Sequence, residues 1–396
     1  MTERFTGSFT QQEPIPEASI AAALRVMQSG RLHRYNTSDG ELSETVQLEQ
    51  EFATYVGAKY CLAVASGGYA IATGLRAVGA KAGDAVLTNA FTLAPVPGAI
   101  ASLGANPKFV GVTKSLTIDL DDLEAKADQA KFLLLSHMRG HICDMDRLMQ
   151  ICDAANIIVV EDCAHTMGAF WRDIPSGRFG AVGCYSTQTY KHMNSGEGGF
   201  LTTDDPEIAA RSIMLSGSYM LYETHLAGPP ASVFEAIKYD TPNISGRMDN
   251  LRAAILRPQL QDLDAQVERW NERYRAIDAG LRDVPGLLVI DRPDQERIVG
   301  SSFQFLLLDW DTGKVQDVVR RCGQRGVELK WFGTPEPKGF TSRYDSWRYA
   351  QSTPMPASDH VLAGVLDVRI PLTFSVEDCA QIARIIRAEV GAVFQS

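Results

Sequence analysis

The sequence predicts an α/β protein, with a mostly parallel β-sheet flanked by helices and a smaller C-terminal α+β domain. Over the first 250 residues, short apolar runs alternate with segments of helical periodicity, a pattern typical of crossover units in a parallel sheet. After residue 250 this alternation stops and amphipathic helical segments dominate. At 396 residues, the chain is long enough for more than one domain. We therefore predict a large domain over residues 1–255, with an N-terminal arm over 1–24, and a small domain over 256–396.

The apolar runs of the large domain are the expected strands. They are YCLAVAS (60–66), AVLTNAF (85–91), KFVGV (108–112), FLLLSH (132–137), NIIVVED (156–162) and VGCYST (182–187). Helical segments such as AIATGLRAVGAK and MDRLMQICDAAN lie between them. Because ligands of open parallel sheets gather at the carboxyl ends of the strands, we expect the polar residues that end these runs to form a site.

The C-terminal part begins with one apolar helical face. Its members recur at spacings of three and four, and they are Leu260, Leu263, Val267, Trp270, Tyr274 and Ile277. Pro258 is expected in the first turn of this helix or at a kink in it. The run SSFQFLLLDW (301–310) predicts a buried strand, and VEDCAQIARIIRAEV (376–390) predicts a closing amphipathic helix.

Composition excludes several classes of function. A net charge of -10 without a long basic block argues against binding to nucleic acid or to an anionic membrane surface. The N-terminus MTERFTGSFTQQEPIPEA lacks the apolar core of a secretion signal, so we expect a cytoplasmic protein. The 7 scattered cysteines favour reduced thiols over a disulfide framework. We expect no metal site, because His137, His141, Cys143 and Asp144 lack a second ligand pair at a suitable spacing.

The chemically informative residues surround one lysine. Asp162 ends the strand-like run IIVVED, with Glu161 before it and His165 after it, and Lys191 follows 29 residues after Asp162. Before them, the strand-to-helix turn SGGYA (66–70) could point the backbone N–H groups of Gly67, Gly68 and Tyr69 at a phosphate.

These pieces suit pyridoxal phosphate (PLP) better than any nucleotide. PLP requires a lysine that holds its aldehyde as a Schiff base, a carboxylate that keeps its pyridine nitrogen protonated, and an anion cradle. Lys191 and Asp162 would fill the first two roles, and Lys191 would then move the proton released from the substrate Cα. The cradle would be the SGGYA turn together with the hydroxyl of Ser186. A surface position for Lys191 remains the alternative.

Several blocks, in the same order, resemble the DegT/StrS group of PLP-dependent sugar aminotransferases. They are VASGGYA (64–70), KAGDAVLTNAFT (81–92), LSHMRGHICDMDRL (135–148), VVEDCAHTMGA (159–169), GCYSTQTYKHMNSGEGGFLTTDD (183–205) and PNISGRMDNLRAAILRPQL (242–260). The resemblance implies the fold type I aspartate aminotransferase architecture with a seven-stranded type of sheet. It implies Lys191 as the Schiff-base lysine, Asp162 as the partner of the pyridine nitrogen and Ser186 as a phosphate ligand. His165 would lie near the phenolic oxygen of the cofactor or serve as a core residue.

The resemblance also implies a homodimer with shared active sites. We expect Asn243 to contact the phosphate of the neighbouring subunit, although the family's short N-x-R-M segment is here spread out from Asn243 to Met248. Ser245 or Arg247 could take this role instead, and Arg247 could merely pair with Asp249.

Other departures from the family concern the substrate. Leu93 stands where relatives carry a ring-stacking aromatic residue, so Phe91 or Tyr69 could cover the ring, with a core position for Phe91 as the alternative. Gly68 replaces the usual Thr. The segment PEPKGF (335–340) lacks the His of the family motif, which makes Trp331 and Lys338 substrate candidates. Arg34 and Tyr35 could lie at the mouth of the site, as in relatives that act on an eight-carbon keto-sugar acid.

The expected function is transamination in a ping-pong cycle. An amino acid, glutamate or glutamine, would give its nitrogen to the cofactor, which would pass it to a keto-sugar or a related polyhydroxylated carbonyl compound. One alternative is a PLP-dependent sugar dehydratase, which Lys191 argues against because those relatives carry His there, although His192 is adjacent. The other alternative is a non-catalytic regulatory protein on the same fold.

Overall fold

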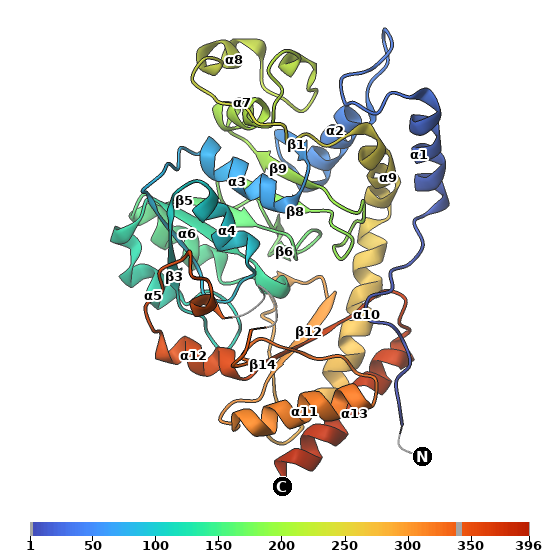
Figure 1. Cartoon of the computed structure of the whole chain (residues 1–396), viewed down its shortest axis with the longest axis vertical. Helices are drawn as coiled ribbons and strands as arrows, with labels where there is room; N and C mark the ends of the chain where they lie inside the picture. Colours follow the sequence, from blue (N-terminus) through green and yellow to red (C-terminus); the bar gives the residue numbers. More distant parts are fainter. Residues whose placement is uncertain (1–2, 338–342, 396) are drawn as a thin grey trace.

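The computed structural model describes residues 3–337 and 343–395, and it is organised around two sheets (Figure 1). The large sheet has seven strands in the order β1-β9-β8-β5-β4-β2-β3. They are β1 (Tyr60–Val64), β2 (Ala85–Asn89), β3 (Asn106–Val110), β4 (Phe132–Ser136), β5 (Ile158–Asp162), β8 (Val182–Ser186) and β9 (Gly199–Thr203). Pairings from β3 through β8 are parallel, whereas β9 runs antiparallel to both of its neighbours. The predicted mostly parallel sheet is confirmed, and β9 is a strand that the prediction omitted.

Helices cover both faces of the large sheet because its strands are apolar on both sides. The helices of this part are α1 (Glu17–Ser29), α2 (Glu44–Val56), α3 (Gly67–Ala77), α4 (Pro95–Ser102), α5 (Leu120–Ala125), α6 (Met145–Ala154), α7 (Pro206–Leu215) and α8 (Ala231–Ile237). On one face, α3, α4, α7 and α8 form a core with Leu134 and Val160. On the other face, α2, α5 and α6 pack on Leu133 and Val159. Alternate residues of β4 and β5 thus supply the two cores.

The predicted apolar helical face is confirmed, but it belongs to two helices. Helix α9 (Asn250–Gln261) ends one residue before α10 (Leu263–Leu281) begins. All six predicted members of the face are buried. Pro258 lies in the last turn of α9, where it cannot donate a backbone hydrogen bond and so weakens the ladder near the break at Asp262. The expected position in a first turn is therefore wrong, because Pro258 lies near the end of α9 and not near its start.

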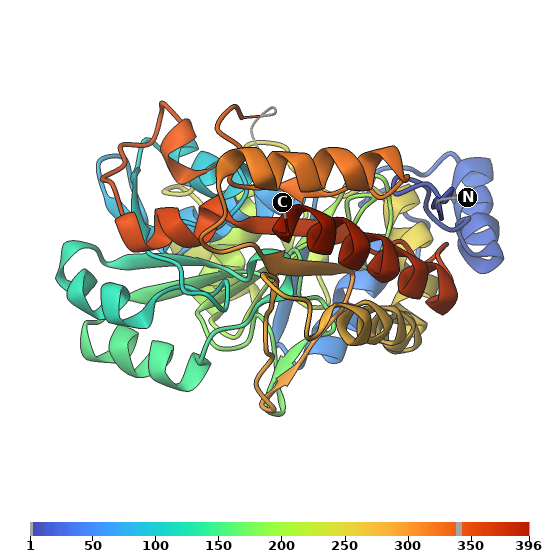
Figure 2. The ribbon, with the colours of Figure 1, turned by 90° about the horizontal axis from the view of Figure 1, so that it is seen from below.

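The C-terminal part contains a four-stranded antiparallel sheet in the order β10-β12-β14-β13. Its elements are β10 (Leu288–Val289), β12 (Ser302–Leu306), α11 (Thr312–Gln324), β13 (Lys330–Trp331), α12 (Pro356–Ala363), β14 (Val365–Arg369) and α13 (Val376–Phe394). Figure 2 shows α11 and α13 side by side. The predicted buried strand is β12 and the predicted closing helix is α13. In the described ranges no helix has an apolar stretch long enough to cross a bilayer, and the cytoplasmic location stays a prediction.

A small third sheet joins the two parts. It consists of β6 (Phe170–Trp171), β7 (Ile174–Pro175) and β11 (Glu296–Arg297), in the order β11-β6-β7. Strand β6 precedes residue 255 and β11 follows it, so the sheet contains residues from both predicted domains. The predicted boundary itself falls inside α9, and the division at 255/256 stays a prediction.

The N-terminal arm packs against the C-terminal part. The rings of Phe5 and Phe9 lie edge-on to Phe374, with centroid distances of 4.9 and 5.0 Å. Arg269 of α10 holds Glu13 with Nη1 and Nη2. The arm predicted over 1–24 ends earlier in the structure, because α1 begins at Glu17. It thus ties the chain start to the C-terminal helices, although the prediction assigned it to the large domain.

All seven cysteines are free and buried. They are Cys61, Cys143, Cys152, Cys163, Cys184, Cys322 and Cys379. Burial raises the pKa of every one of these thiols above its ordinary value. They are inert members of the core under ordinary conditions, because the reactive form of cysteine is the thiolate.

Candidate active site

Lys191 lies in the loop between β8 and β9, at the carboxyl edge of the large sheet. Backbone hydrogen bonds close this loop. The N–H of Thr187 donates to Gly198 O at 2.9 Å, and the N–H of Ser195 donates to Thr187 O at 3.0 Å. Gly198 has a φ of 154°, and a Cβ there would lie 2.3 Å from Thr187 Oγ1. A side chain is therefore excluded at Gly198, and the glycine-rich segment holds Lys191 in a fixed turn.

The amine of Lys191 contacts the ring of His165, with 2.9 Å between Nζ and Nε2. The backbone N–H of Arg139 donates to His165 Nδ1 at 3.4 Å, so Nδ1 is an acceptor and carries no proton. Burial holds the pKa of His165 well below its usual range, so the ring is neutral. Its proton is then on Nε2, and this N–H donates to Nζ. Only a neutral amine can accept this bond.

The electrostatics of the site agree with a neutral lysine. Burial lowers the pKa of Lys191 to about 7. The nearby carboxylate of Asp162 opposes this shift, while the positive charges of Arg139, Arg369 and Lys330 add to it. A neutral amine near pH 7 is the nucleophilic and basic form of lysine. The site therefore prepares Lys191 for bond formation with a carbonyl group.

Asp162 is positioned by a short chain of hydrogen bonds at the ends of β2, β4 and β5. Thr92 Oγ1 donates to Ser136 Oγ at 3.0 Å, and Ser136 Oγ donates to Asp162 Oδ2 at 3.0 Å. The N–H of Ala164 donates to Asp162 Oδ1 at 3.1 Å. Asn89 fixes Ser136 by two further bonds to its backbone. The carboxylate is thus held at the sheet edge on a rigid support.

Glu161, the neighbour of Asp162, has a structural role. Its carboxylate accepts backbone N–H groups of Gly177, Phe179 and Gly180. It also contacts His137 Nε2 at 3.0 Å. With Cys163, His137 and Glu161 form the one group of potential metal ligands found among the described residues. Because four hydrogen-bonding partners already occupy the Glu161 carboxylate, we assign this group to the core.

A helix N-terminus faces Lys191 across the cavity. Ser66 caps α3 by accepting the N–H of Tyr69, which leaves the first-turn N–H groups of Gly67 and Gly68 without an intrahelical acceptor. A Cβ on Gly67 would lie 2.7 Å from Ser186 Cβ, so glycine is required where the helix meets β8. A Cβ on Gly68 would meet only Pro95, at 3.9 Å. The helix dipole, the two N–H groups and Ser186 form an anion cradle.

One cavity of about 370 Å³ brings these groups together. Its polar lining includes Ser66, Gly67, Gly68, Ser136, Asp162, His165, Ser186, Gln188, Lys191 and Glu197, and its apolar lining includes Ile71, Leu93, Pro95, Val96 and Met138. These residues fit PLP, because they provide a neutral amine, a fixed carboxylate and an anion cradle around one space with apolar walls. The sequence did not single out Ser136, Met138, Gln188 or Glu197. The polar ends of the runs FLLLSH and VGCYST were the available signal for Ser136 and Gln188.

Two aromatic candidates for ring stacking lie elsewhere. Phe91 is buried in a separate core, edge-on to Phe332 at a centroid distance of 5.1 Å. Tyr69 donates its hydroxyl to the carbonyls of Leu215 and Ile244, and its N–H is used by the helix cap. The alternative of a core role for Phe91 is therefore the right one. Leu93 does line the cavity.

Arg34 and Tyr35 belong to a different buried cluster and do not line the cavity. Arg34 Nη2 donates to Glu49 Oε2 at 2.8 Å, and both side chains are fully buried. His225 Nδ1 lies 3.2 Å from the same carboxylate oxygen. Tyr35 hydrogen bonds with Ser218 and with His225 Nε2. The prediction that this pair lies at the mouth of the site is therefore wrong, because Glu49 and His225 hold both side chains beside β1.

The segment expected to contact a neighbouring subunit is exposed. Asn243 and Ser245 are exposed, as is Ile244 between them. Arg247 Nη1 donates to Gly217 O at 2.5 Å, whereas the Asp249 carboxylate accepts the backbone N–H and Nη1 of Arg252. The alternative pairing of Arg247 with Asp249 is therefore absent among the contacts of the described residues. The role of Asn243 stays a prediction.

The two C-terminal substrate candidates have different outcomes. Trp331 is half-buried, and its Nε1 donates to Ala363 O at 2.7 Å, which anchors it to the end of α12. It does not line the 370 Å³ cavity. Lys338 lies outside the described residues. The neighbour of Trp331, Lys330, is one of the cations that lower the pKa of Lys191.

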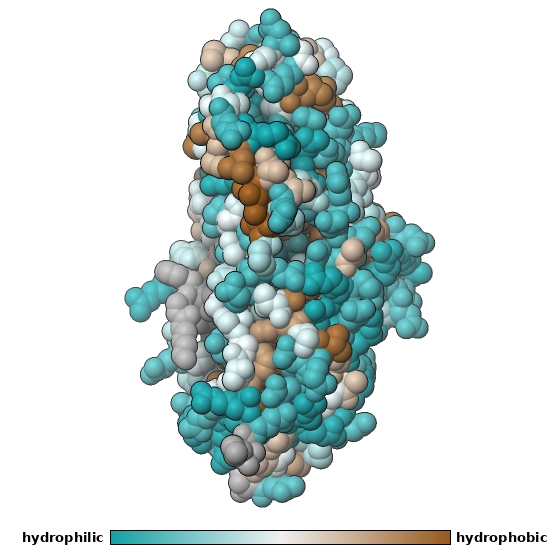
Figure 3. Space-filling model, turned by 90° about the vertical axis from the view of Figure 1, so that its right-hand side faces the viewer, coloured by the Kyte–Doolittle hydropathy of each residue, from teal (hydrophilic) through white to brown (hydrophobic). Residues whose placement is uncertain are grey.

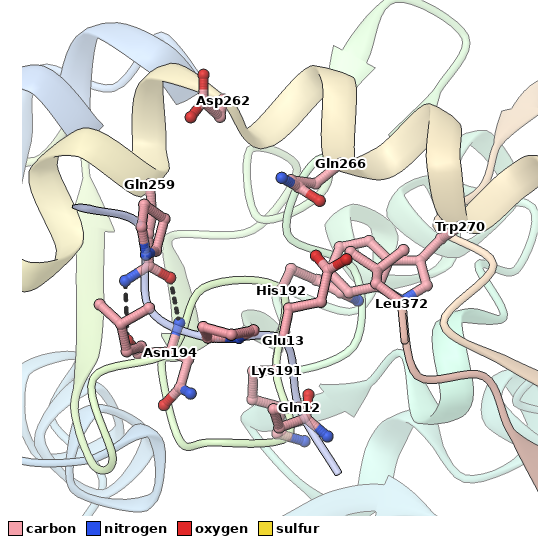
Figure 4. A pocket seen from close by; sticks show the side chains of 13 residues that line it. Gln12, Glu13, Lys191, His192, Asn194, Gln259, Asp262, Gln266, Trp270 and Leu372 are labelled. Carbon is pink, nitrogen blue, oxygen red and sulfur yellow. Dashed lines mark hydrogen bonds between the residues drawn. The ribbon is translucent and has the colours of Figure 1, made fainter. Parts of the chain in front are cut away.

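Lys191 also lines a second cavity of about 90 Å³, between the N-terminal arm and α10 (Figure 4). Gln259 and Asn194 join α9 to the lysine loop by two hydrogen bonds of 2.9 and 2.8 Å. His192 lies edge-on to Trp270 and contacts Ser301 Oγ at 3.1 Å. Consecutive residues thus have separate tasks. Lys191 contacts His165, while His192 anchors the loop to the C-terminal part.

The comparisons with known proteins agree with this geometry. The fold is that of the pyridoxal-phosphate-dependent aminotransferases. The chain belongs to the DegT/DnrJ/EryC1/StrS aminotransferase family, whose model matches residues 15–387.

Individual relatives are moderately similar. The chain is 30% identical to the L-glutamine:2-deoxy-scyllo-inosose aminotransferase of Streptomyces kanamyceticus, over 68% of this chain and 63% of the relative. It is 31% identical to the GDP-perosamine synthase of Caulobacter vibrioides, over 55% of this chain and 57% of the relative. Both matches cover less than two thirds of the relative's length. Among solved structures, DesV of S. venezuelae matches with a TM-score of 0.78, 25% identity and 93% of each chain covered.

Proposed function

We propose that this aminotransferase moves an amino group from glutamate or glutamine to a keto-sugar or a related polyhydroxylated carbonyl compound, in two half-reactions. The observation that carries the proposal is the buried Lys191 amine, 2.9 Å from His165 Nε2, in the cavity where Asp162 and the α3 N-terminus also lie. The activities of the two relatives support the acceptor class, because one acts on an inosose and the other makes perosamine.

Each residue has a defined task in this proposal. When bound, PLP supplies an electron sink that stabilises negative charge at the substrate Cα. Asp162 keeps the ring nitrogen protonated, and its position is set by Ser136 and Ala164. The cradle of Gly67, Gly68 and Ser186 binds the phosphate. Lys191 Nζ attaches the cofactor between turnovers and, as a free neutral amine, moves the proton to and from the substrate Cα.

Absorbance spectra test the proposal directly. PLP added to the protein should give a visible band, which glutamate or glutamine bleaches and a keto-sugar restores. Borohydride reduction followed by peptide mapping should place the modification on Lys191. A protein whose band does not respond to any amino donor, or whose modification maps to another lysine, would contradict the proposal. Loss of a sugar hydroxyl without net amino transfer would instead indicate the dehydratase.

We also propose that two copies assemble and share their active sites. Helix α1 packs Ala22 and Val26 on Ala254 of α9, while Ile20, Leu24 and Met27 on its other face are exposed. Figure 3 shows hydrophobic side chains gathered on the side of the molecule where Figure 1 places α1. Further exposed apolar residues are Tyr219, Met220, Leu221 and Ile244. Such surface supports an interface with a second copy, and Asn243 lies next to Ile244.

Mixing two inactive variants tests the shared site. Lys191→Ala removes the lysine, and Asn243→Asp places a negative charge where the proposal puts the partner's phosphate. If Asn243 serves the partner, hybrids contain one intact site, and random mixing should restore about a quarter of the wild-type activity. Mixtures with no restored activity, a fully active Asn243→Asp variant, or a monomer in light scattering would each contradict the shared site.

A further inference from the structure

A cavity of about 480 Å³ lies apart from the Lys191 site. It is larger than the 370 Å³ cavity, and the two share no lining residue. Its volume is in the range of small-molecule binding sites. The lining residues are 115, 117, 141–144, 171, 172, 291–293, 295 and 296. The proposed transamination uses none of these residues, so the cavity is free for another ligand.

The small third sheet forms part of the wall of this cavity. Trp171 of β6 pairs with Glu296 of β11 in the register of that sheet, and both residues line the cavity. The other lining segments are the loop after β3, the loop before α6 and the chain between β10 and β11. The cavity therefore combines loops of the large sheet with a segment of the C-terminal part.

His141 has an unused hydrogen-bond acceptor at this cavity. The residue is 4% exposed, and its Nε2 lies 2.8 Å from Gln304 Oε1. Gln304 Nε2 donates to Asp367 Oδ1 at 2.6 Å, so the amide oxygen is the atom that accepts from His141. Burial holds the pKa of His141 well below its ordinary value, and the neutral ring carries its one proton on Nε2. Nδ1 is then an acceptor that no donor of the described residues reaches.

Glu296 adds a second unused acceptor. Its side chain is 1% exposed, and its Oε1 accepts the Ile142 N–H and Arg292 Nη1, each at 3.0 Å. Within residues 3–337 and 343–395, no donor bonds to Oε2. Burial raises the pKa of Glu296 above its ordinary value, against the effect of the Arg292 charge. A buried carboxylate with one oxygen unpaired is unfavourable, and a ligand donor at Oε2 would offset this cost.

The charges around the cavity have a negative excess. The carboxylates of the lining and of its ion-pair partners are Asp144, Asp146, Asp278, Asp291 and Glu296. The guanidinium groups of the same set are Arg172, Arg282 and Arg292. Among the described residues, the carboxylates of this set thus outnumber its cations. Such a cavity disfavours an anionic ligand and favours a cationic one.

The remaining lining indicates a hydroxylated ligand. Ser115 and Thr117 contribute hydroxyl groups and Gln295 contributes an amide, and these side chains both donate and accept hydrogen bonds. The Trp171 ring and Pro293 contribute apolar surface. Polar groups that donate and accept beside an aromatic ring match a sugar ring, which has hydroxyls at its rim and C–H groups on its faces.

We propose that this cavity is a second binding site, for a polyhydroxylated compound that carries a protonated amine. The amine donates to Glu296 Oε2, and a hydroxyl of the ligand donates to His141 Nδ1. The inference goes beyond the proposed transamination, because it concerns a cavity that Lys191 does not line. If that function holds, its aminated product belongs to the ligand class of this site, and this clause alone rests on the proposed function.

A chain of buried side chains leads from this cavity towards Lys191. His141 contacts Gln304, Gln304 donates to Asp367, and Asp367 Oδ2 accepts from Arg139 Nη2 at 3.0 Å. The Arg139 charge in turn lowers the pKa of Lys191. We therefore expect a ligand in the 480 Å³ cavity to change PLP affinity, and reciprocity requires PLP to change the affinity for that ligand by the same factor.

The first test is calorimetric binding of glucosamine, which carries hydroxyls and one amine. The protein is first loaded with PLP and reduced with borohydride, so that the cofactor is fixed to Lys191 and cannot react with the probe. Glu296→Gln should weaken glucosamine binding about 10-fold or more, because an amide N–H group replaces the charged acceptor. His141→Phe, which removes Nδ1, should weaken it in the same direction.

The matched control is Glu272→Gln, at an exposed carboxylate of α10, and it should bind glucosamine as the wild type does. Glucose, which lacks the amine, should bind the wild type more weakly than glucosamine. Equal affinities for the two sugars would contradict recognition of the amine. A wild type that does not bind glucosamine, or unchanged affinity in Glu296→Gln, would overturn the site.

Tryptophan fluorescence locates the bound probe. Glucosamine should change the emission of the wild type with the midpoint that calorimetry gives, because Trp171 lines the cavity. In Trp171→Phe the emission change should be lost while calorimetric binding persists. An emission change that remains in Trp171→Phe would place the probe at another site and contradict the proposal.

The connection to Lys191 is tested by comparing two forms of the protein. Glucosamine affinity should differ between the reduced, PLP-loaded form and the cofactor-free form, and Gln304→Met should make the two affinities more similar. Equal affinities in the wild type would contradict the connection. None of these measurements involves amino transfer. A protein that binds glucosamine at Glu296 but transfers no amino group would disprove the proposed function and leave this site intact.

Discussion

Two groups of buried ionisable residues differ in how their charges are balanced. In the group beside β1, the Arg34 guanidinium and the Glu49 carboxylate pair at 2.8 Å. The N–H of Ala63 donates to the other Glu49 oxygen at 2.8 Å, and His225 completes the group. Although burial alone would raise the pKa of Glu49, the Arg34 charge lowers it to about 2. Each charge here has an opposite partner.

The group around Lys191 is arranged in the opposite way. Burial lowers the pKa of Lys191 to about 7, and the three cations Arg139, Lys330 and Arg369 lie near one carboxylate, Asp367, which pairs with Arg139. The balanced group fixes its protonation states over a wide pH range and stabilises the fold. The unbalanced group keeps an amine that can change its protonation near neutral pH, at a cost in stability. Charge balance thus distinguishes the structural cluster from the proposed catalytic one.

Lys191→Met should give the largest effect and separate function from stability. Without the amine, the rate should fall by about 10³-fold or more. The unfolding free energy at pH 6 should rise, because a buried amine is replaced by an apolar chain of similar length. Steady-state assays and urea denaturation measure the two effects. Lys114→Met, at an exposed lysine, is the control and should change neither. A Lys191→Met protein that is active, or less stable than the wild type, would contradict the proposed difference between the two groups.

Asp162→Asn should reduce the rate by about 10²- to 10³-fold, because the carboxylate that would keep the ring nitrogen protonated is lost. The Asp162 charge also raises the pKa of Lys191, so that pKa should fall below about 7 in the variant. Single-turnover spectra over a pH series measure both changes. Asp144→Asn is the control, since Asp144 caps α6 and asparagine is an equally good cap. A pKa of Lys191 that rises would show that Asp162 acts otherwise.

Glu49→Gln should lower the unfolding free energy by about 3–5 kcal/mol, because it leaves the buried Arg34 charge without its partner. The rate per folded molecule should stay near the wild-type value, since neither residue lines the 370 Å³ cavity. The double variant Arg34→Met/Glu49→Met should lose less stability than the two single changes together. Additive losses in this cycle, or a strong loss of rate in folded protein, would show that the cluster has another role.

Stability should also change at the two ends of the pH scale. Glu49 has a folded pKa of about 2 and an ordinary value of 4.5, so its contribution is present above pH 4.5 and is lost as the pH falls towards 2. Lys191 has a folded pKa of about 7 and an ordinary value of 10.5. The unfolded chain then binds more protons, and stability rises between pH 7 and 10.5. Urea unfolding should give a flatter acid limb in Glu49→Gln and a flatter alkaline limb in Lys191→Met. Unchanged limbs would contradict these assignments.

The sequence was sufficient to predict the strands that are buried along most of their length. The runs that became β4, β5 and β8 are apolar on both faces, which only a covered parallel sheet explains. Strand β9 was not predicted, because GFLTT follows glycines that resemble a loop. The break after Pro258 was also undetermined, since a proline can begin, kink or end a helix. Local sequence left these alternatives open, and packing selected one.

Within the site, the sequence identified the residues that lie at the end of a strand or in the loop or turn next to it. Asp162, Lys191, Ser186 and the turn at Gly67 meet at one edge because parallel strands end there. Arg34 was misplaced, because its partners are 15 and 191 residues away and their charges are not visible in the segment RLHRYN. The cluster of Arg139, Lys330 and Arg369 was missed for the same reason. Its three cations come from separate elements that only the packed chain brings together.

Because its seven cysteines are buried, the folded native chain should not react with cysteine-directed labels. Because burial keeps all seven in the unreactive thiol form, a maleimide dye should modify the folded protein only after a surface cysteine is introduced. Tyr219→Cys would place one reporter on the exposed apolar surface near the segment with Asn243. Its labelling rate would then report whether the proposed association of two copies covers this surface, without removal of any native cysteine.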